Sequence, residues 1–369
     1  MRIMFVCSSS NFFGGEKVLM NLAERFKKDG NSVLIIIPQK GDFSNKLEGI
    51  LDYSIVKIIN SVSFSAIPDF YKEIKEFNPD IIHSHGYVSN QISRIMSFLT
   101  KVPVISVLHV LQNYKYNELG LKAYFYRIYD KFTNIISYKN INIAVSSPVA
   151  NTANYLKPIV IPNGMDFPSI SYNYPNKIIK FAMIGRIVNI KGIENVLNTF
   201  LRIKDNYKIT PELLIIGKDI TKGKKWENKF REFVTKNNLS NIRFIDFLDN
   251  IEEIYSKFDC LIHASFEGHE GCPLVLIEAM LRKKLIIFSD IKASKYVMKD
   301  KGIMFSHKNT KTLDDCVLNS LKQSSNKLKV LIENQYNFAI EEYSFEKMYK
   351  NHKLIIFQKL SHKDSKKDI

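Results

Sequence analysis

Two glutamates in the second half of the chain bracket a loop and the start of a predicted helix. An apolar run at 260–264 leads into a polar, glycine-containing loop with Glu270, and then into an apolar helix with Glu278. Pro273 suits the first turn of that helix, where a backbone N–H would have no partner. Free N–H groups and the positive dipole end at a helix start attract anions. Because carboxylates accept hydrogen bonds from sugar hydroxyls, the segment predicts a phosphate site with a hydroxyl-binding group on either side.

Two cations lie around a second glycine-containing turn. Arg186 follows an apolar run at 178–184, and Lys191 opens the next predicted helix. Both side chains should reach the crevice at the carboxyl ends of the strands, where parallel α/β sheets bind ligands. Arginine offers phosphate a planar fork and lysine a compact charge. The alternative is two ordinary surface cations, against which the flanking Gly185 and Gly192 argue.

Two adjacent glycines, Gly14 and Gly15, separate the first predicted strand from the first predicted helix. Such a pair lets backbone approach a ligand closely, and the helix start adds anion-binding character. The spacing is not G-x-G-x-x-G, which argues against a dinucleotide-dependent oxidoreductase. A simple strand-to-helix turn is the alternative.

Three histidines stand at predicted strand ends in the first half. His109 directly follows an apolar run at 104–107, so it should face the crevice of its sheet. His83 and His85 fit buried, hydrogen-bonded histidines that shape the floor of the crevice. No carboxylate or cysteine lies at metal-ligand spacing from them, so we predict no metal site.

Apolar runs alternate with helical stretches along the whole chain, which predicts an α/β fold with parallel sheets covered on both faces. At 369 residues the chain exceeds one ordinary core, so we expect two Rossmann-like, doubly wound domains. The predicted strands are 3–7, 33–37, 55–59, 81–83, 104–107, 141–145 and 159–161, then 178–184, 213–216, 243–245, 260–263, 285–288 and 302–305.

The predicted domain boundaries follow the composition. The first domain covers 1–166, a linker rich in Ser, Asn, Tyr and Pro covers 167–177, and the second domain covers 178–340. A C-terminal helix and a charged tail cover 341–369, and we expect the helix to pack back on the first domain.

The charge and the apolar runs bear on the location of the protein. No run approaches the roughly 18–20 residues of a membrane-spanning helix, and the N-terminus reads as a strand rather than a signal peptide, so we expect a cytoplasmic protein. Its four cysteines are widely spaced and should be reduced. The formal net charge of +16 fits either a solvated lysine surface or attraction to an anionic membrane or nucleic acid.

Aromatic and basic residues interleave at 111–140. Aromatic rings with basic neighbours suit a membrane interface and would also suit stacking on single-stranded nucleic acid. An ordinary helix that buries its aromatics is the third interpretation. The basic side chains that would face a membrane are Lys115, Lys122, Arg127 and Lys131.

Taken together, these motifs resemble those of the family 4 glycosyltransferases, retaining enzymes of the GT-B fold. G-R-x4-K-G is matched by Gly185, Arg186, Lys191 and Gly192, and E-x7-E followed by Ala-Met is matched from Glu270 to Met280. The I-P-N-G-x-D segment is matched at 161–166. The sequence departs from the family at Lys283 and Leu285, where a Gly and a Pro are usual, and in the following loop at Lys292, Ala293 and Tyr296.

The resemblance implies two domains facing a central cleft and a metal-independent hexosyltransferase that uses a nucleoside-diphosphate sugar and no cofactor. Arg186, Lys191 and the helix start would hold the diphosphate, Glu278 the ribose, and Glu270 the transferred sugar, with His109 beside the sugar carbon under attack. The full donor-binding set expected is Gly14, Gly15, Gly185, Arg186, Lys191, Glu270, Gly271, Pro273, Leu274, Val275 and Glu278.

The acceptor is expected to be a saccharide or a polyprenyl-diphosphate-linked saccharide. Net charge, the aromatic–basic stretch and analogy with basic family members suggest synthesis of a surface polysaccharide (O-antigen, capsule or lipopolysaccharide) by a peripheral protein on the inner face of the cytoplasmic membrane, with no nucleic acid partner. Two alternatives stay open: a sugar-nucleotide 2-epimerase of the same fold, and a non-catalytic protein that binds RNA or membrane.

Overall fold

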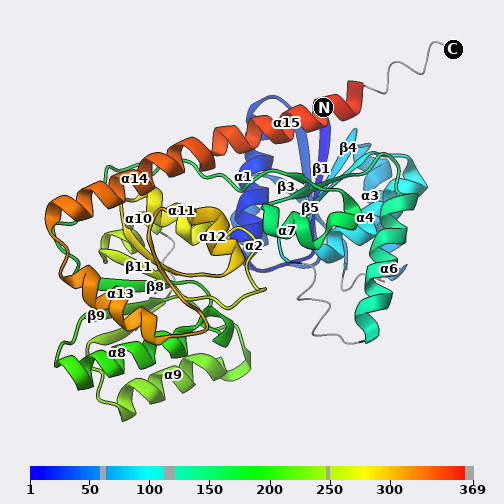
Figure 1. Cartoon of the computed structure of the whole chain (residues 1–369). Helices are drawn as coiled ribbons and strands as arrows, with labels where there is room; N and C mark the ends of the chain where they lie inside the picture. The colour runs from blue at the N-terminus through cyan, green and yellow to red at the C-terminus, as the bar shows by residue number, and fades with distance from the viewer. Residues whose placement is uncertain (59–63, 112–120, 247–249, 362–369) are drawn as a thin grey trace. The chain divides into compact units, whose positions relative to one another are not determined.

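The computed structural model describes the chain except residues 59–63, 112–120, 247–249 and 362–369. It divides into two compact units. Unit 1 is Met1–Gly164 together with the C-terminal segment that begins at Phe345, and unit 2 is Met165–Ser344. Each unit has one parallel sheet with helices around it (Figure 1).

In unit 1 the described strands have the order β3-β2-β1-β4-β5-β6-β7. Chain order reverses at β1, which pairs with β2 on one side and β4 on the other, so the carboxyl ends of β1 and β4 form a switch point where such sheets bind ligands. The strands are β1 Arg2–Cys7, β2 Ser32–Ile37, β3 Asp52–Ile55, β4 Ile81–His85, β5 Val104–Leu108, β6 Ile141–Ala144 and β7 Ile159–Val160. The helices are α1 Gly14–Lys28, α2 Asp42–Leu47, α3 Ile67–Phe77, α4 Tyr87–Thr100, α6 Leu121–Ile136, α7 Ser147–Thr152 and α15 Phe345–Ser361.

Unit 2 repeats this plan with the strand order β10-β9-β8-β11-β12-β13. Its switch point lies between β8 and β11. The strands are β8 Lys180–Ile184, β9 Glu212–Ile216, β10 Ile242–Ile245, β11 Cys260–His263, β12 Leu285–Ser289 and β13 Ile303–Phe305. The helices are α8 Ile193–Tyr207, α9 Lys225–Lys236, α10 Ile251–Ser256, α11 Leu274–Leu281, α12 Lys292–Met298, α13 Lys311–Leu321 and α14 Ser325–Tyr343. The predicted α/β class with two doubly wound parallel sheets is confirmed.

The predicted strand at 55–59 is wrong in position, because β3 is Asp52–Ile55. The ladder runs from Leu34 opposite Asp52 to Ile37 opposite Ile55, and it ends where β2 ends. Val56 and Ile58 lie beyond the ladder and are buried in the core. The apolar run therefore marked core residues rather than the strand itself.

The segments near the predicted boundaries have their own packing. Tyr172, in the predicted linker 167–177, donates a hydrogen bond of 2.6 Å to the Glu252 carboxylate, so this segment is part of unit 2. The helix α15 belongs to unit 1. Its Tyr349 stacks edge-on against Phe26 and donates a hydrogen bond of 2.6 Å to Asp29 of the segment after α1.

Candidate functional site

An ion pair occupies the switch point of unit 2. Lys191 Nζ lies 2.5 Å from Glu270 Oε1, although the two residues are far apart in sequence. Gly192 makes this approach possible, because its φ is +71° and a Cβ there would lie 2.1 Å from the Ala264 carbonyl oxygen. The turn that carries Lys191 therefore rests directly on the loop after β11. A hollow of about 20 Å³ beside the pair is lined by Gly185, Arg186, Lys191, His263, Ser265 and neighbouring apolar residues.

Glu270 is ionised in this environment. Burial raises the pKa of its carboxyl, but the Lys191 ammonium and His263 outweigh burial, and the pKa lies well below its ordinary value. Ser265 Oγ also donates a hydrogen bond of 2.8 Å to Glu270, and His263 Nε2 lies 3.6 Å from the same oxygen. The site thus holds a fixed carboxylate beside a fixed ammonium, which suits a ligand with both hydroxyl and phosphate groups.

His263 and Ser265 were missing from the predicted site. The sequence carried a weak signal for both, since they stand at the carboxyl end of the predicted strand at 260–263. His263 is held by Ser294 Oγ, 3.1 Å from Nδ1. Its ring is therefore oriented toward Glu270 by a residue on α12.

Glu278 lies on α11 and is half-buried. The hydroxyl of Tyr255 donates to its Oε2 at 3.0 Å, and Tyr255 is completely buried. The Arg282 guanidinium lies 5.0 Å from the centroid of the Tyr255 ring and donates two hydrogen bonds to the Glu252 carboxylate. This buried support fixes the carboxylate, and sequence reasoning did not include Tyr255.

The start of α11 differs slightly from the prediction. Pro273 is the N-cap with extended backbone, one residue before the helix rather than in its first turn. Leu274 and Val275 form the first turn, and Gly271 precedes the cap in the loop from Glu270. The anion-attracting helix start is therefore in the same unit as Arg186 and Lys191.

In unit 1 the predicted residues gather at the switch point. Gly14 and Gly15 begin α1 directly after the loop from β1, and a Cβ on Gly15 would lie 4.0 Å from His109 Cγ. His109 follows β5 and its Nε2 lies 2.9 Å from His85 Nδ1. His83 and His85 are buried and hydrogen-bonded. His83 also contacts His352 of α15, which the sequence gave no reason to select.

The departures from the family motifs have local structural counterparts. Lys283 has a φ of +53°, a conformation that suits the glycine usual at this position. Its ammonium lies 4.7 Å from the Tyr174 ring centroid and 5.1 Å from that of Tyr336, which offsets part of the strain. In the next loop, the backbone N–H of Lys292 donates a hydrogen bond to the Glu267 carboxylate, so the Glu267 side chain contacts the start of α12.

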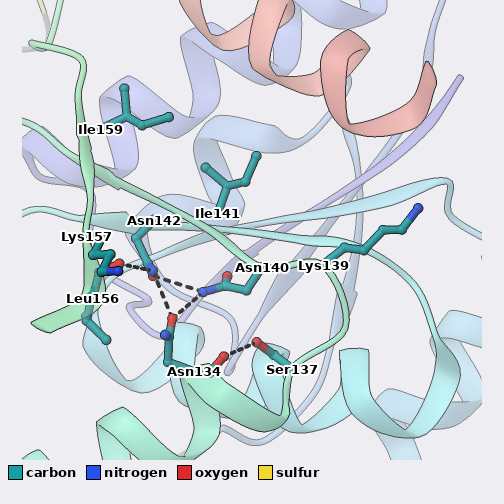
Figure 2. Close-up of a pocket in the computed structure, with 9 residues that line it drawn as sticks. All are labelled: Asn134, Ser137, Lys139, Asn140, Ile141, Asn142, Leu156, Lys157 and Ile159. Atoms are coloured by element: carbon teal, nitrogen blue, oxygen red, sulfur yellow. Dashed lines mark hydrogen bonds between the residues drawn. The ribbon is translucent and has the colours of Figure 1, made fainter. Parts of the chain in front are cut away.

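A larger hollow of about 410 Å³ lies at the opposite, amino-terminal edge of the unit 1 sheet (Figure 2). Its polar lining is an amide cluster in which Asn134 accepts hydrogen bonds from Asn140 and Asn142. These groups already bond one another, and the hollow is remote from the carboxyl ends of the strands. We therefore do not assign it to the site.

The aromatic–basic stretch forms α6 from Leu121 onward. One face, with Asp130 and Thr133, is buried in the unit, while Phe125 is 70% exposed and belongs to an apolar face open to solvent. Lys115 and the side chain of Lys122 lie outside the described residues. The exposed apolar residues of α6 are Tyr124, Phe125, Ile128, Phe132 and Ile135. The interpretation of α6 as a helix that buries its aromatics is thus wrong for these residues.

Two family models match the chain. "Glycosyltransferase Family 4" matches residues 13–167, and "Glycosyl transferases group 1" matches residues 169–338. A capsular polysaccharide biosynthesis glycosyltransferase of Staphylococcus aureus, CapH, is 24% identical over 311 residues, which is 80% of this chain and 83% of that protein. An uncharacterized glycosyltransferase of Methanocaldococcus jannaschii is 26% identical over 252 residues, 63% of this chain and only 62% of that protein.

Solved structures share the fold. The Anabaena protein HepE in complex with UDP has a TM-score of 0.82 at 16% identity, with 97% of this chain and 100% of that chain covered, and it was also solved with UDP-glucose. WaaG, a glycosyltransferase involved in lipopolysaccharide biosynthesis, has a TM-score of 0.72 at 15% identity, with 96% and 99% covered. In the part of the chain that the structure describes, no helix has the length and apolar character needed to cross a bilayer.

Proposed function

Because the chain belongs to the family 4 glycosyltransferases of the GT-B fold, we propose that it transfers a hexose from a nucleoside-diphosphate sugar to a saccharide or polyprenyl-diphosphate-linked saccharide. The Lys191–Glu270 pair at the switch point of unit 2 carries this proposal, since it holds a cation and a hydroxyl acceptor side by side. HepE binds UDP and UDP-glucose, which favours a uridine-diphosphate hexose as the first donor to test.

The chemistry follows from the charges at the site. As the bond from the sugar carbon to the phosphate oxygen breaks, negative charge grows on the diphosphate, where Arg186, Lys191 and the start of α11 would offset it. Incoming phosphate would compete with Glu270 for Lys191 and leave the carboxylate to bind sugar hydroxyls. These protein cations supply the charge that a metal would otherwise supply, so the proposed reaction is metal-independent and uses no cofactor.

Retention is part of the proposal. The acceptor oxygen bonds to the sugar carbon on the face from which the diphosphate departs, and a phosphate oxygen of the leaving group takes the acceptor's proton. His109 of unit 1 would contact the sugar. Exclusion of water from the site would favour transfer over hydrolysis.

The test of this function measures nucleoside diphosphate release from a panel of nucleotide sugars, with and without EDTA. Glu278→Ala should weaken donor binding by about 1.5–3 kcal/mol, because a carboxylate contact with ribose hydroxyls is lost. Calorimetry measures that loss, and Glu253→Ala, an exposed glutamate on α10, is the control.

Three outcomes would each contradict one part of the proposal. Donor affinity equal to wild type in Glu278→Ala would remove this residue from the site, and full inactivation by EDTA that Mg²⁺ restores would overturn the metal-free chemistry. Epimerised nucleotide sugar without nucleoside diphosphate release would indicate the 2-epimerase instead.

We also propose that α6 binds the anionic inner face of the cytoplasmic membrane, where a polyprenyl-linked acceptor for capsule, O-antigen or other lipopolysaccharide synthesis would lie. Arg127 and Lys131 are exposed on the same helix as the apolar face, and the chain carries a net charge of +16. An amphipathic helix with these features lies in the membrane interface. CapH acts in capsular polysaccharide biosynthesis, which supports an acceptor of this class.

Sedimentation with vesicles tests the membrane surface. Binding should increase with anionic lipid and decrease with salt, and Arg127→Gln with Lys131→Gln should weaken it by about 1 kcal/mol per charge. Lys72→Gln with Lys75→Gln on α3 removes the same charge from another exposed helix as a control. Equal weakening by both pairs would indicate a diffuse charge effect and would reject α6 as the membrane face.

A further inference from the structure

Four histidines of unit 1 form one continuous line of hydrogen bonds. His109 Nε2 lies 2.9 Å from His85 Nδ1, His85 Nε2 lies 3.0 Å from His83 Nδ1, and His83 Nε2 lies 3.1 Å from His352 Nδ1. Successive ring centroids are 4.9–5.1 Å apart. The line joins the switch point of the sheet to α15 at the other end of the sequence.

Every ring in this line is neutral. Burial lowers the pKa of His109 to about 4 and that of His352 to about 3, and the pKa values of His83 and His85 lie well below the ordinary value because of burial and the neighbouring rings. The start of α1 near His109 also disfavours a positive charge there.

A neutral imidazole has one N–H donor and one acceptor nitrogen. Each link in the line joins an Nε2 to an Nδ1, so each link needs an N–H on one side only. If His109 carries its proton on Nε2, then His85, His83 and His352 must do the same. The only other arrangement that makes all three bonds puts every proton on Nδ1.

We propose that His85, His83 and His352 are positioning residues that set the tautomer of His109, and that all four carry the proton on Nε2. This arrangement places the commoner tautomer of neutral imidazole at each position. It leaves Nδ1 of His109 as an acceptor for a hydroxyl of the bound sugar, a role that rests on the proposed function. His352 of α15 thereby determines whether Nδ1 of His109 accepts or donates a hydrogen bond.

Nitrogen NMR of the ¹⁵N-histidine-labelled protein without any ligand tests the line directly. Long-range ¹H–¹⁵N correlations should show four histidines of the Nε2–H form with low pKa. His352→Leu removes the acceptor of the His83 Nε2–H and would leave a buried N–H without a partner. The arrangement with every proton on Nδ1 keeps the two remaining bonds and leaves only an acceptor nitrogen unpaired, which costs less. The three protons should therefore move to Nδ1, and His109 should change form although it is three hydrogen bonds from position 352. His352→Gln can still accept through its side-chain oxygen and should leave His109 unchanged.

Mixed tautomers in the wild-type line, or an unchanged His109 in His352→Leu, would overturn the proposal. Ile356→Val, also buried on α15, controls for general loosening of the helix and should leave the tautomers as they are. If His352→Leu does not fold, a change of His109 in His352→Gln to the Nδ1–H form would overturn the coupling as stated.

Kinetics adds a second readout. With a saturating donor, His352→Leu should lower turnover about tenfold, because Nδ1 of His109 could no longer accept a hydrogen bond from the sugar hydroxyl. His352→Gln should retain the wild-type turnover. Reduced turnover in His352→Leu with an unchanged His109 tautomer would show a merely structural role. Absence of turnover in the wild type with every donor would contradict the proposed function alone, because the NMR result does not depend on it.

Discussion

Lys191→Ala should lower turnover with a saturating donor by about 10²–10³-fold, because in the proposed reaction the ammonium would offset charge that grows only as the sugar–phosphate bond breaks. Arg186→Ala should have an effect of the same order for the same reason. Nucleoside diphosphate release measures both, and Lys236→Ala, an exposed lysine at the end of α9, is the control for lost charge.

The ion pair with Glu270 makes a second variant necessary. The Glu270 carboxylate is ionised in the wild type, and removal of Lys191 leaves it without its partner. Part of the lost turnover could therefore come from a rearranged loop. Lys191→Ala combined with Glu270→Gln removes both charges. If this double variant recovers wild-type turnover, the loss came from the orphaned carboxylate and the phosphate role of Lys191 is wrong.

Local sequence patterns were sufficient for most of the fold and for the positions of the motif residues at the ends of strands, while the roles of those residues stay predictions. Parallel strands buried on both faces are continuous apolar runs, and a glycine or cation right after such a run must lie at the ligand-binding edge. Arg186, Lys191 and His109 were located in this way. The predicted position of β3 was wrong because the same pattern was read beyond the strand. Val56 and Ile58 are buried although the β2–β3 ladder ends at Ile55.

Two residues that sequence reasoning had no cause to select reach their partners through tertiary packing. Tyr255 reaches Glu278 from α10, and His352 reaches His83 from the far end of the chain. Neither stands in a motif, and each looks in sequence like an ordinary residue on the apolar face of a helix. Only the packing of one helix on another element brings such side chains to a functional group, so periodicity cannot identify them.

The largest expected effect on stability is at Arg94, which lies fully buried on α4. Its guanidinium donates to Asp130 at 2.6 Å, to Asn142 at 2.6 Å and to Ser106 at 3.1 Å, and so ties α4 to α6 and to two strands. Arg94→Ala should destabilise unit 1 by about 3–5 kcal/mol, because it leaves the buried Asp130 carboxylate without its counter-charge.

Two spectroscopic signals can locate that loss. The chain's one tryptophan, Trp226, lies in unit 2, so its fluorescence follows unit 2, whereas circular dichroism follows both units. In urea, Arg94→Ala should lower the midpoint seen by circular dichroism more than the midpoint seen by fluorescence. Arg202→Ala in unit 2 breaks a pair with Asp314 that is partly exposed, and it should cost only about 0.2–1 kcal/mol.

A double variant separates the charge from the packing. Arg94→Met with Asp130→Leu removes both buried charges and should recover much of the stability lost in Arg94→Ala, since apolar groups of similar volume often replace a buried ion pair without cost. Gln91 and Tyr155 would lose their bonds to Asp130, so recovery should be incomplete. If the double variant is less stable than Arg94→Ala, the network stabilises unit 1 through its hydrogen bonds rather than through charge pairing. The position of α6, which carries Asp130, would then depend on those hydrogen bonds.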